Sequence, residues 1–255
     1  FLRNADTNRD GNKISSVNGI GEETFYGSIP AEDSEDGKAS GGKVTLDEDV
    51  DVGNVIGGSG NTAIGNTVTI SNGLVKYQAI GGDGYGGATG NSVVINDGII
   101  GADDYCAIVA GGSGQYNDGE VKGNTVNVAG GSIYGAVLGG VANPIGSVVE
   151  GNEVKITGGE IYEDVLGGFG DSVTGNIVTV SNEKEDCYID YTVFGGRGNT
   201  VVGNTVNVTG GYLFDIVGGG GNNVEGNIVN ITGGEIIGEI IGGVGLLNNP
   251  GGEPK

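Results

Sequence analysis

The side chains best suited to binding a metal ion lie in the segment DTNRDGN (6–12). Oxygen-bearing residues alternate there and are followed by Gly11, as at the start of an EF-hand-like calcium loop. The twelfth position of that loop would be Val17, where a bidentate Glu is expected. The segment therefore predicts either an Asx-rich surface turn or a calcium site. The ligands of that site would be Asp6, Asn8, Asp10 and Asn12. Calcium is the only cofactor that we expect.

Two runs of carboxylates, at 32–36 and 47–51, could supply the pair of acids that hydrolyses a glycosidic bond. The chain has no histidine, which excludes Ser-His and Cys-His mechanisms. A polysaccharide lyase needs a converging basic residue, and arginine occurs only at positions 3, 9 and 197. We therefore predict that the chain is not an enzyme, with a carbohydrate-active β-helix (polysaccharide lyase or glycoside hydrolase) as the alternative.

Three aromatic residues recur in one register of the repeat described below: Tyr134, Tyr162 and Phe214. If this column faces outward, it forms a strip that could contact sugar rings or a partner protein. If it faces inward, it is ordinary core. The two cysteines, Cys106 and Cys187, fall three coils apart, on the order of 14 Å at strand spacing, which is too far for a disulfide. Both are predicted to be small buried hydrophobic residues.

The element that must position these residues is an internal repeat. The unit reads GN-x-V-x-I-x-GG-x-I-x-x-x-V-x-GG-x-G, as in VNVTGGYLFDIVGGG from Val206 and VNITGGEIIGEIIGG from Val229. The second Gly-Gly pair returns every 23 to 30 residues. Apolar residues alternate with polar ones after each Gly-Asn, which is the period of a strand with one buried face.

One unit cannot bury its own apolar side, whereas stacked units can, each strand pairing with its equivalent in the next coil. The sequence therefore predicts an all-β fold, a single-stranded right-handed parallel β-helix (β-solenoid) of about eight coils with three short strands per coil. Residues 1–40 do not follow the repeat and are expected to form an N-terminal cap or preceding segment. The β-helix is expected over 41–247 and a tail or linker over 248–255.

The Gly-Asn pairs place one asparagine at the same point of every coil. Amides stacked at strand spacing hydrogen-bond to one another along the column. We predict a structural asparagine ladder formed by Asn66, Asn91, Asn124, Asn152, Asn176, Asn204 and Asn227. The glycines are expected to serve turns that need a positive φ angle.

The net charge of −22 predicts a surface that repels nucleic acid and anionic lipid. No stretch approaches the 18 consecutive apolar residues of a transmembrane helix, so no membrane insertion by this segment is expected.

The phrases GNTVNVAGG (123–131), GNTVNVTGG (203–211) and GNIVNITGG (226–234) resemble the repeats of adhesin and autotransporter-like surface proteins of anaerobic bacteria. The resemblance covers about 41–247. It implies a secreted, extended β-helix that displays or carries other modules, outside the cell or on its surface. We expect a rigid stalk, with a host glycan or a matrix protein as its possible partner. A phage tail-spike shaft is a further alternative, which would form an SDS-resistant trimer. The oligomeric state itself is left open.

Overall fold

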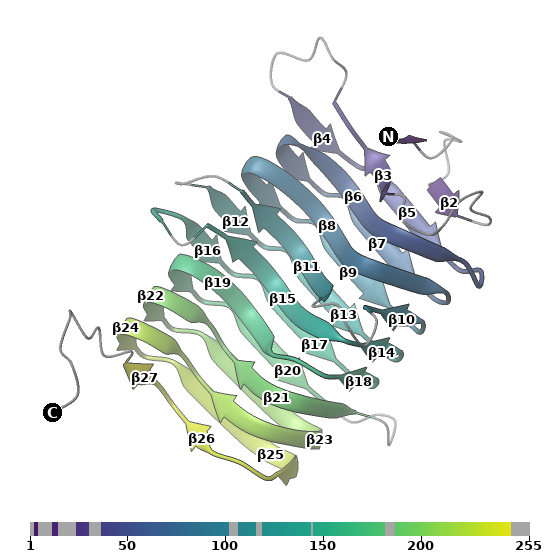
Figure 1. The fold of residues 1–255 in the computed structure, drawn as a ribbon. Coiled ribbons are helices and arrows are strands. Elements are labelled where there is room, and N and C mark those ends of the chain that lie inside the picture. Colours follow the sequence, from purple (N-terminus) through teal and green to yellow (C-terminus); the bar gives the residue numbers. More distant parts are fainter. Residues whose placement is uncertain are drawn as a thin grey trace, which may run out of the picture.

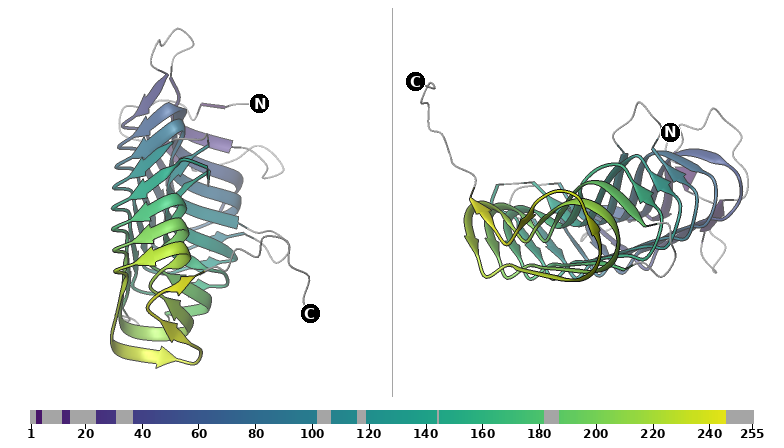
Figure 2. Two further views of the ribbon diagram at one scale, coloured as in Figure 1. Left: turned by 90° about the vertical axis from the view of Figure 1, so that its left-hand side faces the viewer. Right: turned by 90° about the horizontal axis from the view of Figure 1, so that it is seen from below.

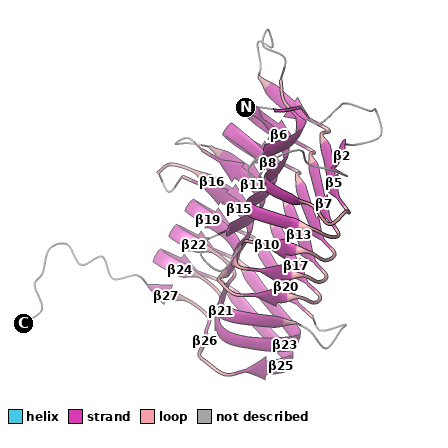
Figure 3. Cartoon of the chain, turned by 45° about the vertical axis from the view of Figure 1, so that its right-hand side comes forward, coloured by secondary structure: helices cyan, strands magenta, loops and turns pink. Residues whose placement is uncertain are grey.

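The computed structural model describes residues 3–4, 12–14, 24–30, 37–101, 107–115, 119–143, 145–181 and 187–245. In this part of the chain the regular elements are all strands, and no helix occurs (Figure 3). Every pairing between strands is parallel, and successive coils stack along one axis (Figure 1). The predicted β-solenoid is confirmed, with about seven turns.

Each coil has four walls, and in both views of Figure 2 each coil lies next to the following one from the N-terminal to the C-terminal end of the stack. The first wall follows each Gly-Asn pair. It consists of β2 (Asn12–Ile14), β5 (Lys43–Leu46), β7 (Thr67–Ile70), β9 (Ser92–Ile95), β13 (Thr125–Val128), β17 (Glu153–Ile156), β20 (Ile177–Val180) and the starts of β23 (Thr205–Val217) and β25 (Ile228–Ile236). The second wall is short. It consists of the starts of β6 (Asp51–Ile64), β8 (Leu74–Thr89) and β21 (Tyr188–Phe194), with β10 (Ile99–Ile100), β14 (Ser132–Ile133), β18 (Glu160–Ile161) and later parts of β23 and β25.

The third wall passes through the Gly-Gly pair, where the chain bends. Its strands are β1 (Arg3–Asn4), β3 (Thr24–Ser28), β11 (Ala107–Gly114), β15 (Gly135–Ala142), β19 (Val165–Thr174), β26 (Ile240–Ile241), β27 (Val244–Gly245) and parts of β6, β8, β21 and β23. The return wall consists of β4 (Lys38–Ser40), β12 (Glu120–Lys122), β16 (Val148–Glu150), the ends of β6, β8 and β19, and the later parts of β22 (Arg197–Val202) and β24 (Gly220–Glu225). The first residues of β22 and β24 continue the third wall, where they pair with β19 and β27.

The return wall adds a strand to the three expected in each coil. The segment before each Gly-Asn pair varies in length, yet it ends in a strand with one buried small residue, such as Val121 or Val149. Parallel stacking also extends into the N-terminal segment. There β3 and β4 pair with β6, and β2 pairs with β5. Residues 248–255 lie outside the described residues.

The buried apolar residues form three clusters. One of them consists of residues that directly precede the Gly-Gly pairs of the third wall, Ile56, Ile80, Ala110, Leu138 and Leu166. The other two fill the interior. The larger one fills the space between the first three walls and runs from Phe25 to Ile216 without a break. The smaller one, which includes Val121, Val149 and Val173, packs between the return wall and the glycines of the third wall. Cys187 belongs to the larger cluster and is buried, as predicted. Cys106 lies outside the described residues.

The asparagine ladder is confirmed and lies between the two interior clusters. The Nδ2 of each asparagine donates to the Oδ1 of the next, at 2.9 Å for every step from Asn66 to Asn227. The backbone N–H of the same residue donates to the same oxygen. Each Nδ2 group also donates its other hydrogen to a backbone carbonyl of the return wall. The bond from Asn152 Nδ2 to Val121 O, for example, is 3.1 Å long. The ladder therefore joins successive coils and also joins two walls of the solenoid.

Two kinds of glycine serve this ladder for different reasons. The glycine before each asparagine has the positive φ predicted for a turn, +60° at Gly123 for example, and nothing lies within 4 Å of an added Cβ. The Gly-Gly pair of the third wall lacks a positive φ. A Cβ at Gly112 would instead lie 2.6 Å from the Asn124 side chain. The pair is required by close packing against the ladder, which differs from the turn role that we expected.

Candidate binding surface

The outer face of the second wall carries stacked aromatic side chains. Tyr134 and Tyr162 each follow a fully buried isoleucine, Ile133 and Ile161, so the alternation of a strand turns them outward. Their rings lie 4.7 Å apart between centroids and 4° from parallel. Both side chains are half-buried. The sequence left open whether this column faces outward or inward, and in the structure it faces outward.

Two further tyrosines, which the sequence interpretation missed, complete the column. Tyr188 and Tyr212 stack at 5.5 Å, and Phe214 meets Tyr212 edge-on at 6.4 Å. Tyr162 and Tyr188 are tilted by 58° at 6.2 Å. We call the five residues Tyr134, Tyr162, Tyr188, Tyr212 and Phe214 the aromatic strip. The signal for the missed pair was a tyrosine directly before a buried residue, in the runs YID and YLF.

The stacking decides what the aromatic strip can offer to a ligand. In the pairs Tyr134–Tyr162 and Tyr188–Tyr212, the facing ring surfaces cover each other. Ring edges and phenol hydroxyls are left toward solvent. The strip is therefore better suited to polar contacts than to stacking a sugar ring on an aromatic face.

Carboxylates accept hydrogen bonds from these phenols. The hydroxyl of Tyr162 donates to Glu160 Oε2 at 2.8 Å, and that of Tyr188 donates to Asp190 Oδ1 at 2.8 Å. The bond to Glu160, with smaller contributions from burial and the carboxylate charge, raises the pKa of Tyr162 to about 12. The bond to Asp190 and burial likewise raise the pKa of Tyr188. Both carboxylates are held in fixed orientations at the surface.

A β-bulge interrupts the register next to the aromatic strip. Ile189 and Thr192 of β21 pair with Leu213 and Asp215 of β23, so β21 has one residue more than its partner. Tyr191 lies within this bulge, and 51% of the residue is exposed. Tyr191 takes part in no ring contact with the residues that the structure describes.

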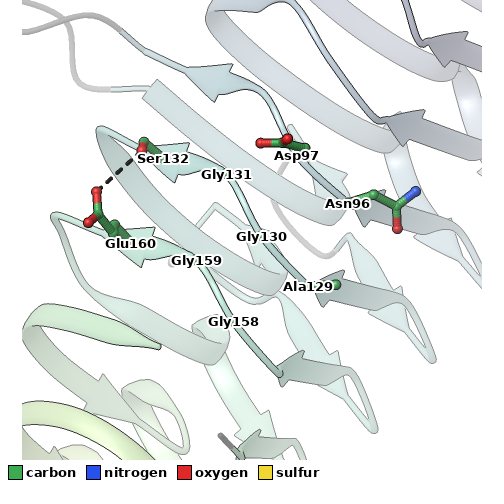
Figure 4. A pocket seen from close by; sticks show the side chains of 9 residues that line it. All are labelled: Asn96, Asp97, Ala129, Gly130, Gly131, Ser132, Gly158, Gly159 and Glu160. Carbon is green, nitrogen blue, oxygen red and sulfur yellow. Dashed lines mark hydrogen bonds between the residues drawn. The ribbon is translucent and has the colours of Figure 1, made fainter. Parts of the chain in front are cut away.

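A shallow pocket of about 440 Å³ lies over the turns between the first and second walls (Figure 4). Its floor is the backbone of Gly130, Gly131, Gly158 and Gly159, and Asp97 and Glu160 approach it from coils two apart. A neighbouring pocket of about 370 Å³ adds Asp49 and Asp51 from the second predicted carboxylate run. No lysine or arginine lines either pocket within the described ranges, so the basic residue of a lyase site is missing from both.

The predicted calcium loop lies almost entirely outside the described residues and stays a prediction. Asp6, Asn8 and Asp10 lie outside the described residues, and Asn12 is the first residue of β2, opposite Val44 of β5. Among the described residues, no group of three or more Cys, Asp or Glu side chains could hold a metal ion. Ladder asparagines from Asn66 to Asn204 are at most 1% exposed, so they cannot contact a ligand.

Comparison with protein-family models, with curated proteins and with solved structures finds no match for this chain. Within the described part, no helix is long and apolar enough to cross a membrane.

Proposed function

We propose that this chain is a non-catalytic module of a bacterial surface protein, a rigid stalk that also presents a binding surface. The observation that carries the proposal is the unbroken ladder from Asn66 to Asn227, which links successive coils through buried hydrogen bonds. Buried and fully paired polar networks favour one rigid arrangement. The acidic composition and the resemblance of the repeats to bacterial adhesins support a location outside the cell.

The binding half of the proposal rests on the second wall. Its outer face combines ring edges, phenol hydroxyls and fixed carboxylates, all on short strands of a stiff frame. Such a surface suits recognition without chemistry, because no lysine or arginine among the described residues lines the pockets beside it.

The test is an array of glycans and host-matrix proteins, probed with the purified chain in calcium and again with a chelator. A reproducible hit that Tyr162→Ala or Glu160→Ala removes supports the adhesive role of the second wall. Loss of binding with chelator assigns calcium a part in it. A blank array in both conditions contradicts the adhesive role and leaves the stalk role, which the ladder supports separately.

One observation favours a second candidate, a glycoside hydrolase. Asp97 and Glu160 approach the larger pocket from coils two apart, roughly 10 Å along the axis at strand spacing. Inverting enzymes hold their two carboxyl groups about 6.5–9.5 Å apart, which long side chains over this pocket could reach. Release of reducing sugar from a polysaccharide panel, abolished by Asp97→Asn and by Glu160→Gln, would replace the non-catalytic proposal.

A further inference from the structure

The most exposed aromatic ring near the aromatic strip is surrounded by carboxylates. Glu163 occupies the position equivalent to Tyr191 one coil earlier, because Ile161 pairs with Ile189 and Val165 with Val193. Asp190 precedes Tyr191 in the chain, and Asp164 and Asp215 flank Thr192 in the neighbouring coils. We call Tyr191, Glu163, Asp164, Asp190 and Asp215 the Tyr191 patch.

Three of the four carboxylates of this patch are oriented by a hydrogen bond. Asp164 Oδ1 accepts the Thr192 N–H at 3.1 Å, and Asp215 Oδ1 accepts the Glu239 N–H at 2.7 Å. Asp190 Oδ1 accepts the Tyr188 hydroxyl. In each case one carboxylate oxygen is used, and the other accepts no hydrogen bond from the described residues.

Among the residues that the structure describes, the charge of the patch has no ion-pair partner. Lys122 pairs with Glu120 and Glu150 on the return wall, and within the described ranges no ion pair reaches the Tyr191 patch. A divalent cation is not the natural occupant, because no group of three carboxylates among the described residues converges closely enough to hold one. The arrangement fits distributed positive charges on a larger partner.

We propose that the Tyr191 patch binds an arginine-containing segment of another polypeptide. A guanidinium group stacks on an open tyrosine face and pairs with carboxylates through its planar fork of donors. The ring of Tyr191 is open to such stacking, whereas the facing surfaces in the strip are covered. Tyrosine and arginine are also the residues that dominate binding energy at protein interfaces.

The experiment uses the full chain and short labelled peptides, alternating arginine with glycine, lysine with glycine, or glutamate with glycine. Fluorescence anisotropy should show binding of the arginine peptide that weakens with added salt, weaker binding of the lysine peptide and none of the glutamate peptide. Tyr191→Leu should weaken arginine-peptide binding about tenfold, and Tyr191→Phe should not. Glu163→Gln should weaken it several-fold, because a charge-assisted bond is lost.

Matched controls lie on other walls. Tyr85 is 48% exposed at the far end of the third wall, and Glu225 is exposed on the return wall. Tyr85→Leu and Glu225→Gln should bind like the parent chain, and thermal melting should show that every variant is folded. If Tyr191→Leu fails to fold, Glu163→Gln compared with Glu225→Gln decides the outcome.

The proposal is overturned if no arginine peptide binds, or if Tyr191→Leu and Tyr85→Leu weaken binding equally. It is also overturned if a glycan, rather than a peptide, is the ligand whose binding Tyr191→Leu removes. The inference rests on the binding half of the proposed function. Its failure leaves the stalk role intact, because that role depends on the ladder and is measured separately.

Discussion

The side chain of Asn124 fills the space in which a β-carbon on Gly112 would have to lie. The distance from that Cβ to Asn124 Cγ would be 2.6 Å, and Gly58 with Asn66 and Gly82 with Asn91 repeat the relationship at 2.4 and 2.3 Å. The Gly-Asn and Gly-Gly pairs of each coil are therefore two parts of one packing constraint. The ladder asparagine can keep its position only if the second residue of the Gly-Gly pair has no β-carbon.

Gly112→Ala should lower the free energy of unfolding by about 3 kcal/mol, since the buried ladder cannot move away from an added methyl group. Gly123→Ala is the matched control. There φ is +60° and the added Cβ meets nothing within 4 Å, so the cost is about 1 kcal/mol of backbone strain. Urea unfolding followed by circular dichroism measures both. Equal losses would contradict the packing role of the Gly-Gly pair.

Asn152→Ala should destabilise the chain by about 3 kcal/mol or more, because it leaves buried donors and acceptors unpaired. The lost bonds include those from Asn124 Nδ2 at 2.9 Å and to Val121 O at 3.1 Å. Asn230→Ala removes a bond to Asn207 of the same kind and length, 2.9 Å, at an exposed position. Its cost should stay below about 0.5 kcal/mol. A ladder that contributes nothing to stability would give the two variants the same melting temperature.

Tyr162 should titrate well above an ordinary tyrosine, and ring-labelled NMR can follow it. Its pKa in the folded chain is raised from 10.0 to about 12. The hydrogen bond between Tyr162 and Glu160 therefore makes its full contribution to the stability of the folded chain below pH 10. That contribution is lost as the pH rises through about 12. Glu160→Gln should bring the pKa of Tyr162 down toward 10, since the first cause of the shift is the bond to Glu160. Glu153→Gln on the first wall is the control, and a midpoint that Glu160→Gln does not move would refute the assignment.

Cys187 should react slowly with thiol reagents while the chain is folded. Burial raises the pKa of its thiol from 9.0 to about 11. The reactive thiolate is then about a hundredfold scarcer at neutral pH, so the rate falls by at least that factor. A Cys106→Ser background isolates the residue, and the same reaction in denaturant gives the reference rate. Native labelling within tenfold of that reference would show that the site opens readily.

The parts of the fold that depend on a repeated residue type could be predicted. The ladder and first wall follow from one asparagine and two alternating apolar residues in each coil. The return wall escaped notice, because its inward residue is alanine in some coils and valine in others, as at Ala88 and Val121, after a loop of variable length. The pairing of β3 and β4 with β6 was missed because these two strands belong to a segment that lacks the Gly-Asn motif.

The binding surface was less predictable than the fold. The register of Tyr134 and Tyr162 was visible in the sequence, and their stacking confirms it. Tyr191 lies where β21 has one residue more than β23, and this relationship is set by pairing between coils and is not visible in the local sequence. The Tyr191 patch likewise gathers carboxylates from three successive coils.

The ladder and sheet hydrogen bonds between coils also set how this molecule responds to a pull along its length. These bonds run between successive coils, so the coils carry in series any tension that is applied at the two ends. The coils should then open singly, each of 23–30 residues releasing roughly 80–100 Å of chain at about 3.4 Å per residue. A stalk built in this way would absorb a sudden force by lengthening in steps, while the coils still closed keep their shape.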